Sequence, residues 1–284
     1  MSSNQPCLSH VRQGKHTQPH IRLNDGTMMP QFGLGVWKTP AAETDGIVRH
    51  AVASGYLAVD TAAIYRNEEG VGAALSGHPD IYLTTKVWND DQGYDTTLHA
   101  FDASMQKLRR EALDLYLIHW PRPAEGKFVD TWKALVRLRE EGRVRSIGVS
   151  NFRAEDIDRI MEATGVAPAV NQIELHPRFQ QHALRAYNEK HDIRTESWSP
   201  LGQGKILEEP VITAIARKHG KTPAQVIIRW HLDNGLIVIP KSAAPKRIDE
   251  NIAVFDFHLD EVDLQQIAGL DCADGRIGPD PSIF

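Results

Sequence analysis

The chain has 284 residues, of which 41% are hydrophobic and 24% charged, and its formal net charge is -5. This composition is typical of a globular protein with one large domain, and the absence of a lysine- and arginine-rich block argues against a nucleic-acid partner. No apolar stretch reaches the roughly 18 residues that cross a bilayer, so we expect no membrane partner. Cys7 and Cys272 have neither metal-ligand spacing nor a disulfide framework around them, which favours a cytoplasmic protein.

The polar residues 1–20 are expected to form a disordered tail, followed by a single domain over residues 21–284. The segments 21–23 and 28–31 flank the turn sequence Asn24-Asp25-Gly26-Thr27 and predict a short hairpin at the start of this domain.

From residue 33 onward, strand-like runs alternate with amphipathic segments of helical period. We predict eight strands, at residues 33–37, 57–61, 82–87, 113–120, 145–151, 169–174, 194–198 and 236–240. Helices are predicted between them, at residues 44–54, 97–109, 130–141, 154–163, 183–191 and 223–232. This order predicts an α/β fold, a (β/α)8 TIM barrel. Residues 207–219 and 260–270 do not fit the repeat and predict two extra helices outside the barrel.

An open, doubly wound sheet is the structural alternative to the barrel. Such sheets bind dinucleotides through a Gly-x-Gly-x-x-Gly turn after a strand. The two candidate turns, Gly33-Leu34-Gly35 and Gly70-Val71-Gly72, continue to Lys38 and Leu75 instead of the third glycine. The barrel is therefore favoured.

Four ionisable residues, Asp60, Tyr65, Lys86 and His119, lie at or just past the ends of strand-like runs, where barrel enzymes keep their chemistry. Reduction of a carbonyl group builds negative charge on oxygen, so its site needs a proton donor and hydrogen-bond donors. Tyr65 fits the acid, Lys86 would lower the pKa of that phenol, and Asp60 would hold the ammonium group. His119 fits an orienting donor whose charge the sequence leaves open. Each residue alone has an ordinary structural explanation, but their joint placement favours catalysis.

The chain resembles the aldo-keto reductase family, with motifs closest to those of bacterial 2,5-diketo-D-gluconate reductases. The matching segments lie between about residues 21 and 281 and include Val59-Asp60-Thr61-Ala62-Ala63-Ile64-Tyr65, Thr84-Thr85-Lys86-Val87-Trp88, Tyr116-Leu117-Ile118-His119-Trp120-Pro121, Gly148-Val149-Ser150-Asn151-Phe152, Asn171-Gln172-Ile173-Glu174 and Ile239-Pro240-Lys241-Ser242. The resemblance implies that the Asp, Tyr, Lys and His at these positions form the catalytic tetrad of a nicotinamide-dependent barrel enzyme.

The segment 240–251 is the predicted phosphate site of the cofactor. Lys241, Ser242 and Arg247 supply two cations and a hydroxyl group near the start of a helix, which suits a 2′-phosphate, and the resemblance favours NADPH over NADH. The resemblance further implies a set of contacts to the rest of the cofactor. These are Ser150, Asn151 and Gln172 at the carboxamide, Trp198 stacked on the nicotinamide with Ser199 and Leu201 beside it, and Glu250 and Asn251 near the adenine.

A substrate pocket is predicted from Trp37, Trp88, Asn89 and Trp120 together with His119. Aromatic walls with one amide suit a small carbonyl compound with some polar groups. We expect the short segment 274–284 to leave this pocket open. Arg66 stands where the resemblance leads us to expect glycine, a residue that often marks positive φ.

The sequence thus predicts an NADPH-dependent reductase of aldehydes and ketones, with 2,5-diketo-D-gluconate or related keto-sugar acids as candidate substrates. Two alternatives stay open: a reductase that detoxifies methylglyoxal and other small dicarbonyls, and a low-turnover NADPH-sensing binding module. A metalloenzyme barrel is disfavoured because the histidines make no ligand-spaced cluster. The resemblance favours a monomer.

Overall fold

The computed structural model describes residues 18–284, so most of the predicted tail lies outside the described residues. His20, the last residue of that predicted tail, already begins strand β1. The expected hairpin is present: β1 (His20–Arg22) pairs antiparallel with β2 (Met28–Pro30), and Ile21 lies opposite Met29. Gly26 in the connecting turn has φ of 89°, a conformation that glycine adopts freely.

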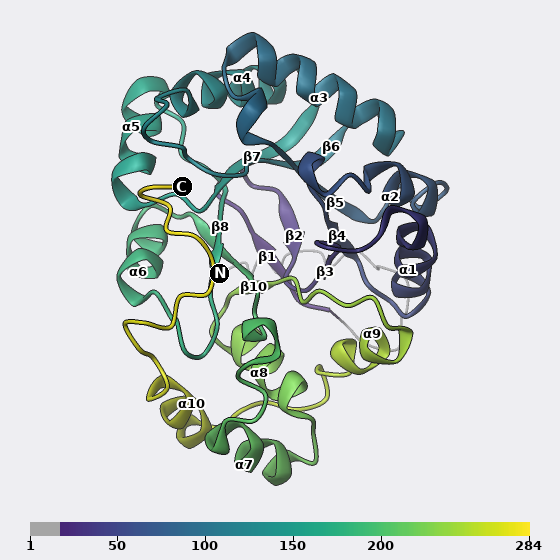
Figure 1. The fold of residues 1–284 in the computed structure, drawn as a ribbon, viewed down its shortest axis with the longest axis vertical. Helices are drawn as coiled ribbons and strands as arrows, with labels where there is room; N and C mark the ends of the chain where they lie inside the picture. The colour runs from purple at the N-terminus through teal and green to yellow at the C-terminus, as the bar shows by residue number, and fades with distance from the viewer. Residues whose placement is uncertain (1–17) are drawn as a thin grey trace, which may run out of the picture.

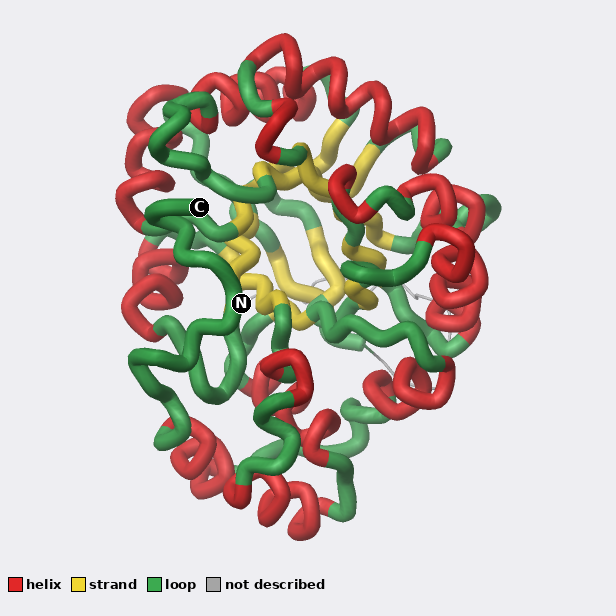
Figure 2. Tube along the Cα trace, viewed as in Figure 1, coloured by secondary structure: helices red, strands yellow, loops and turns green. Residues whose placement is uncertain are grey.

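The predicted barrel is confirmed. Eight parallel strands pair in the order β10-β9-β8-β7-β6-β5-β4-β3, and bridges from Phe32 to Val238 and from Gly35 to Lys241 join the two ends. Figure 2 shows the strands as a ring surrounded by helices. The strands are β3 (Leu34–Gly35), β4 (Ala58–Asp60), β5 (Tyr82–Val87), β6 (Leu113–Ile118), β7 (Val144–Ser150), β8 (Val170–Glu174), β9 (Arg194–Trp198) and β10 (Ile237–Val238).

The first and last barrel strands are shorter than predicted. Their apolar runs extend further, but the parallel ladder between them is reduced to isolated bridges. One reason is Pro240, which has no N–H to contribute, although its carbonyl still accepts a hydrogen bond from Gly35 N at 3.3 Å. In Figure 1 the hairpin of β1 and β2 appears inside the ring of barrel strands.

Helices cover the outside of the ring (Figure 1). They are α1 (Ala41–Ala53), α2 (Glu68–Ala74), α3 (Tyr94–Leu108), α4 (Phe128–Glu140), α5 (Ala154–Thr164), α6 (His182–Lys190), α8 (Pro223–Asp233) and α9 (Pro245–Ile252). The two extra helices are also present, as α7 (Pro210–His219) and α10 (Glu261–Ala268). They pack beside α8 around a second apolar cluster that includes Ile212, Ile215 and Ile267.

Helix α2 is absent from the sequence predictions because two of its seven residues are glycines, which disfavour helix. Gly72 explains this composition. A Cβ atom at position 72 would lie 2.4 Å from the carbonyl oxygen of Lys107 and 2.8 Å from Cα of Leu108. Helices α2 and α3 therefore approach backbone to backbone at this point, which only glycine permits.

The apolar core has an outer and an inner part. The larger cluster fills the space between the sheet and the helices and contains buried side chains such as Phe101, Trp132 and Ile147. A smaller cluster, including Leu23 and Met29 of the hairpin with Leu115 and Leu117, fills the barrel interior. The interior is therefore packed at the hairpin end, and polar side chains collect toward the opposite end, where the strands terminate. None of the helices within residues 18–284 has the length and apolar character needed to cross a membrane.

Candidate active site

The four predicted catalytic residues converge at the carboxyl ends of three adjacent strands. Asp60 is the last residue of β4, Lys86 is the penultimate residue of β5, and His119 directly follows β6. Tyr65 ends the short 3-10 helix η1 (Ala63–Tyr65) that follows β4. The barrel therefore brings together side chains that lie far apart in the sequence.

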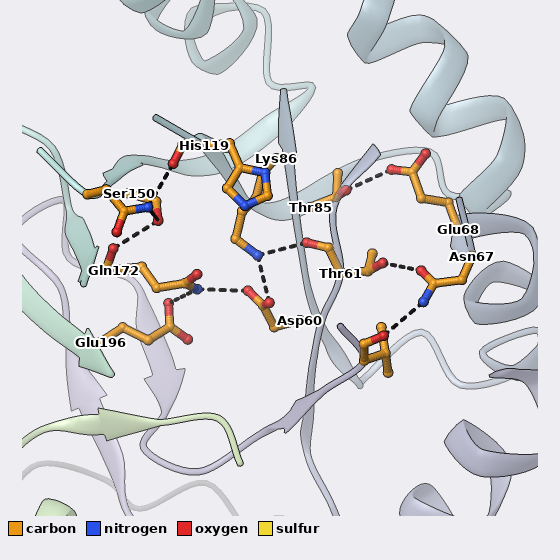
Figure 3. A network of polar contacts seen from close by, with 12 residues as sticks. Asp60, Thr61, Asn67, Glu68, Thr85, Lys86, His119, Ser150, Gln172 and Glu196 are labelled. Carbon is orange, nitrogen blue, oxygen red and sulfur yellow. Dashed lines mark hydrogen bonds and ion pairs between the residues drawn. The ribbon is translucent and has the colours of Figure 1, made fainter. Parts of the chain in front are cut away.

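Lys86 and Asp60 form a buried ion pair. Lys86 Nζ donates to Asp60 Oδ1 at 2.6 Å and to the carbonyl oxygen of Thr61 at 2.9 Å (Figure 3). Burial by itself lowers the pKa of Lys86, but Asp60 and Tyr65 outweigh this effect and the net pKa is raised. The ammonium group is therefore held in its charged form.

Tyr65 lies next to this ion pair. The centre of its ring is 5.4 Å from Lys86 Nζ and 5.7 Å from the centre of the His119 ring. Burial raises the pKa of Tyr65 to about 12, and Lys86 acts in the opposite direction, as its position in the sequence predicted. The desolvation of the phenol is the larger effect, so the net pKa of Tyr65 is raised although Lys86 lowers it as predicted. The phenol stays protonated and can donate.

His119 is a neutral imidazole here. Burial and the charge of Lys86 both hold the pKa of His119 well below its usual range. The ring packs edge-on against Trp88, with 5.1 Å between ring centres, and Nδ1 is buried without a hydrogen-bond partner among the described residues. This resolves the charge that the sequence left open.

Polar residues after β4 fix the turn that carries Tyr65. Arg66 has φ of 55°, so the left-handed conformation suggested by the expected glycine is present even though the residue is arginine. Asn67 then accepts from Thr61 Oγ1 at 2.7 Å and donates to the carbonyl oxygen of Val36 at 2.9 Å (Figure 3). These contacts tie the Tyr65 turn to two strands. Sequence reasoning assigned Asn67 no role.

Glu68 adds a further buried anchor. It is 1% exposed and accepts from Thr85 Oγ1 at 2.7 Å, on the side of β5 opposite Lys86. Lys107 Nζ approaches its other oxygen at 3.9 Å. Helix α2 is thereby held against the strand that carries Lys86.

The residues predicted at the nicotinamide carboxamide form one hydrogen-bonded group. Ser150 Oγ donates to the carbonyl oxygen of Gln172 at 2.8 Å, and Asn151 Nδ2 donates to the carbonyl oxygen of His119 at 3.0 Å. Gln172 Nε2 donates to Asp60 Oδ2 at 2.8 Å and to Glu196 Oε2 at 2.9 Å (Figure 3). Gln172 thus links these residues directly to the Lys86–Asp60 ion pair, and it also bonds Glu196, a residue that sequence reasoning missed.

Trp198 is the last residue of β9 and its indole Nε1 donates to Asn151 Oδ1 at 2.7 Å. Its ring centre is 6.4 Å from that of Trp120. The next residue, Ser199, has φ of 49°, and Leu201 leads into the 3-10 helix η3 (Gly202–Gly204). Trp198 therefore lies beside Asn151, and the contacts of Trp198, Ser199 and Leu201 to a cofactor stay a prediction.

The predicted phosphate loop carries a group of cations. Partial burial, Arg247 and Lys38 all lower the pKa of Lys241, and Glu43 opposes them. Lys38, which sequence reasoning did not include, therefore shares this site. Ser242 is 2% exposed and accepts from the amide of Ala244 at 3.3 Å, just ahead of α9.

The two residues predicted near the adenine lie on α9. The carboxylate of Glu250 accepts from Thr222 Oγ1 at 2.8 Å, at the start of α8. Asn251 is 4% exposed. Glu250 thus has a structural partner in this conformation, and a role of either residue toward adenine stays a prediction.

The predicted pocket residues differ in exposure. Trp37 is 40% exposed, whereas Trp120 is 7% and Asn89 4% exposed. Asn89 Oδ1 is buried and has no partner among the described residues, as expected for a group that meets a substrate or water. Trp88 packs on His119 as described above.

The segment after α10 contacts the barrel at two points, and the open pocket expected from its shortness stays a prediction. Glu174, at the end of β8, accepts from the backbone amides of Ile277 at 2.6 Å and Gly278 at 2.8 Å. Phe284 then lies on Trp120, with 4.6 Å between ring centres. The short segment is thus bonded directly to the end of a strand.

Comparison with known proteins agrees with this geometry. The model of the aldo/keto reductase family matches residues 23–271. An aldo-keto reductase of Mycolicibacterium smegmatis is 58% identical over 270 residues, which are 94% of this chain and 98% of the relative. Methylglyoxal reductase DkgA of Yersinia pestis is 52% identical over 94% of this chain and 98% of its own length.

Solved structures of similar proteins also match this chain over most of its length. A variant of Gox0644 in complex with NADPH is 62% identical, with a TM-score of 0.93 over 94% of this chain and 98% of the other. An aldo/keto reductase from Brucella melitensis is 53% identical, with a TM-score of 0.88 over 93% of this chain and 100% of the other. The resemblance read from the motifs is confirmed, and the chain belongs to the aldo/keto reductase family.

Proposed function

We propose that this protein is an NADPH-dependent reductase that converts aldehyde or ketone groups of small molecules to alcohols. The observation that carries the proposal is the buried Lys86–Asp60 pair beside Tyr65 and a neutral His119. A proton donor, a fixed positive charge and a neutral hydrogen-bond donor at one strand-end site are what carbonyl reduction needs.

The residues present fit a phosphorylated dinucleotide. Lys241 and Arg247 with the nearby Lys38 offer positive charge ahead of α9, which suits a phosphate group. At the other end, Gln172 has no hydrogen-bond donor on Oε1 among the described residues, so that oxygen can accept from a carboxamide. The NADPH complex of the related Gox0644 variant supports this cofactor.

NADPH supplies the hydride when it is bound. Tyr65 donates its phenolic proton to the carbonyl oxygen, and Lys86 stabilises the phenolate that results. His119 presents one imidazole N–H to the same oxygen and orients the carbonyl group. Asp60 keeps Lys86 in place through both steps.

For the substrate, we propose small dicarbonyl compounds, with methylglyoxal as the first candidate. The name of the DkgA relative, methylglyoxal reductase, supports methylglyoxal. Trp88 packs on His119 and Phe284 packs on Trp120, and aromatic side chains of this kind suit a small molecule. Keto-sugar acids such as 2,5-diketo-D-gluconate are the second candidate, which the motif pattern favours.

The test is the initial rate of NADPH oxidation with methylglyoxal, 2,5-diketo-D-gluconate and an aromatic aldehyde. We expect turnover of all three to be measurable and methylglyoxal to have the highest kcat/KM. A higher kcat/KM for the sugar acid would reverse the substrate order. Tight NADPH binding with no turnover of any carbonyl compound would contradict the reductase and favour an NADPH-sensing binding module.

A further inference from the structure

Glu196 is a carboxylic acid in the middle of β9 that lies inside the barrel and is 0% exposed. In the parallel ladder it pairs with Gln172 of β8 on one side and with Ile237 of β10 on the other. Among the described residues, its hydrogen bonding consists of the donation from Gln172 Nε2 to Oε2 at 2.9 Å, and Oε1 is buried without a partner. An ionised carboxylate in such surroundings would be strongly disfavoured.

The bond from Gln172 is one half of a bridge between two carboxyl groups. The two hydrogens of the same Nε2 atom reach Asp60 Oδ2 at 2.8 Å and Glu196 Oε2 at 2.9 Å (Figure 3). With both acceptors in place, the amide nitrogen is fixed and Oε1 of Gln172 points away from the two carboxyl groups. Without Glu196, one of the two anchors of this amide is lost.

The protonation state of Glu196 depends on the charges of Asp60 and Lys86 beside it. Lys86 neutralises Asp60 through a direct contact of 2.6 Å, and its second bond goes to the carbonyl oxygen of Thr61. Burial and the negative charge of Asp60 raise the pKa of Glu196 to about 8, although Gln172 and Lys86 act in the opposite direction. At neutral pH the carboxyl group is therefore un-ionised.

Several titratable groups face Glu196 across the barrel. Its negative charge, when present, raises the pKa of Tyr65 from η1 and of Tyr82 from β5. The groups that face it are Asp60 from β4, Tyr65 from η1, Tyr82 and Lys86 from β5, and Gln172 from β8. Ionisation of Glu196 would thus make the Tyr65 phenol a weaker proton donor.

We propose that Glu196 is a positioning residue that, in its un-ionised form, fixes the amide of Gln172 for the cofactor carboxamide and leaves the Lys86–Asp60 pair without added negative charge. This inference rests on the proposed NADPH-dependent reduction, and it predicts that kcat/KM falls at alkaline pH. Above the pH at which Glu196 ionises, the Gln172 amide lies between two anions and Tyr65 donates its proton less readily.

The experiment compares the wild type with Glu196→Gln and Glu196→Ala. NADPH dissociation constants are measured by quenching of tryptophan fluorescence, and kcat and KM for methylglyoxal are measured from pH 6 to pH 9. Asp114→Asn is the matched control, because Asp114 is also a buried barrel carboxyl group, but it accepts from the amide of Leu83 and from Arg145.

We expect Glu196→Ala to weaken NADPH binding by about 3- to 10-fold, the size of one lost hydrogen bond. Glu196→Gln keeps an acceptor oxygen for Gln172, so it should bind NADPH within about twofold of the wild type and lose the alkaline fall in kcat/KM near pH 8. Asp114→Asn should change neither quantity.

Unchanged NADPH binding in Glu196→Ala would overturn the role toward Gln172. An alkaline limb that persists in Glu196→Gln would overturn the role toward Tyr65. Neither result would contradict the proposed reductase function, since the wild type would still bind NADPH and turn over a carbonyl compound. If the wild type fails to bind NADPH, the proposed function and the role of Glu196 fall together.

Discussion

Lys86 Nζ lies 2.6 Å from Asp60 Oδ1, and the two side chains are 0% and 5% exposed. Because water is excluded from the pair, each charge depends on the other, and both belong to the group that surrounds Tyr65. The same contact therefore affects both folding and reactivity, and these two effects can be separated by mutation.

Asp60→Ala should lower the free energy of unfolding by about 3 kcal/mol, since it leaves the Lys86 ammonium group buried without a counter-charge. The double variant Asp60→Ala/Lys86→Met removes both charges and should recover most of this loss. Urea unfolding of the three proteins measures the difference. Reductase activity should stay low in both variants, and a double variant as unstable as Asp60→Ala would contradict the explanation.

Tyr65→Phe should lower kcat/KM for a carbonyl substrate by at least about 100-fold, because the phenol is the proposed proton donor. NADPH binding and the free energy of unfolding should change little. Tyr94→Phe is the control, since Tyr94 is 39% exposed. Full activity in Tyr65→Phe would remove Tyr65 from the mechanism.

Arg247→Ala should raise the dissociation constant of NADPH by about 10-fold or more and that of NADH much less, because this guanidinium group, beside Lys241, is proposed to bind the 2′-phosphate. Lys38→Ala should show a smaller effect of the same kind. Lys246→Ala tests a neighbouring exposed cation of α9 and should leave both affinities unchanged. Equal losses for NADPH and NADH in Arg247→Ala would place this residue away from the 2′-phosphate.

The stability of the wild type should fall as pH rises from 6.5 to 8. In this window the folded chain keeps the Glu196 proton, whose pKa is about 8, while the unfolded chain has released it, since its ordinary pKa is 4.5. Unfolding therefore releases a proton, and the free energy of unfolding decreases by about 2 kcal/mol over the window.

The measurement is urea unfolding of the wild type and of Glu196→Gln, which lacks this proton. Buried histidines affect both proteins equally, and most of their effect lies below pH 6.5, because burial lowers the pKa of His231 from 6.5 to about 4. The same slope in both proteins would show that Glu196 is ionised throughout.

The barrel could be predicted from the sequence because its strands are apolar runs that end in polar residues. The tetrad followed from the same ends, where Asp60 and His119 terminate such runs. Glu196 could not be found this way. Its neighbours Asp60 and Lys86 come from strands more than a hundred residues away, and its state depends on burial that no local pattern encodes.

Lys38 and Asn67 were missed because their contacts also depend on how separate strands come together. Lys38 reaches the phosphate loop through the closure of β3 against the segment after β10, a contact between distant parts of the chain. The net pKa of Tyr65 could not be predicted, because the sequence shows the cation beside the phenol but not the desolvation around it. The sequence indicated which charged groups lie together, but it did not show whether burial or charge has the larger effect on a pKa.

Two glycines should respond in opposite ways to alanine. Gly46, inside α1, has nothing within 4 Å of its Cβ position, so Gly46→Ala should raise the free energy of unfolding by about 0.5 to 1 kcal/mol. Gly72→Ala meets the backbone of Lys107 and Leu108 and should be destabilising. Thermal unfolding of both variants decides this, and a stable Gly72→Ala would show that α2 can move away from α3.

The contacts of Glu174 bear on how substrate preference can be re-engineered. This carboxylate bonds the backbone, not the side chains, of Ile277 and Gly278, and Gly278 sits so close that a Cβ atom there would lie 2.4 Å from the Trp198 ring. A loop exchanged from a relative would therefore dock correctly whatever its other side chains, provided that it keeps a glycine at 278 and that the recipient keeps Glu174. The segment could therefore be exchanged as a unit, provided that Glu174 and Gly278 are both kept.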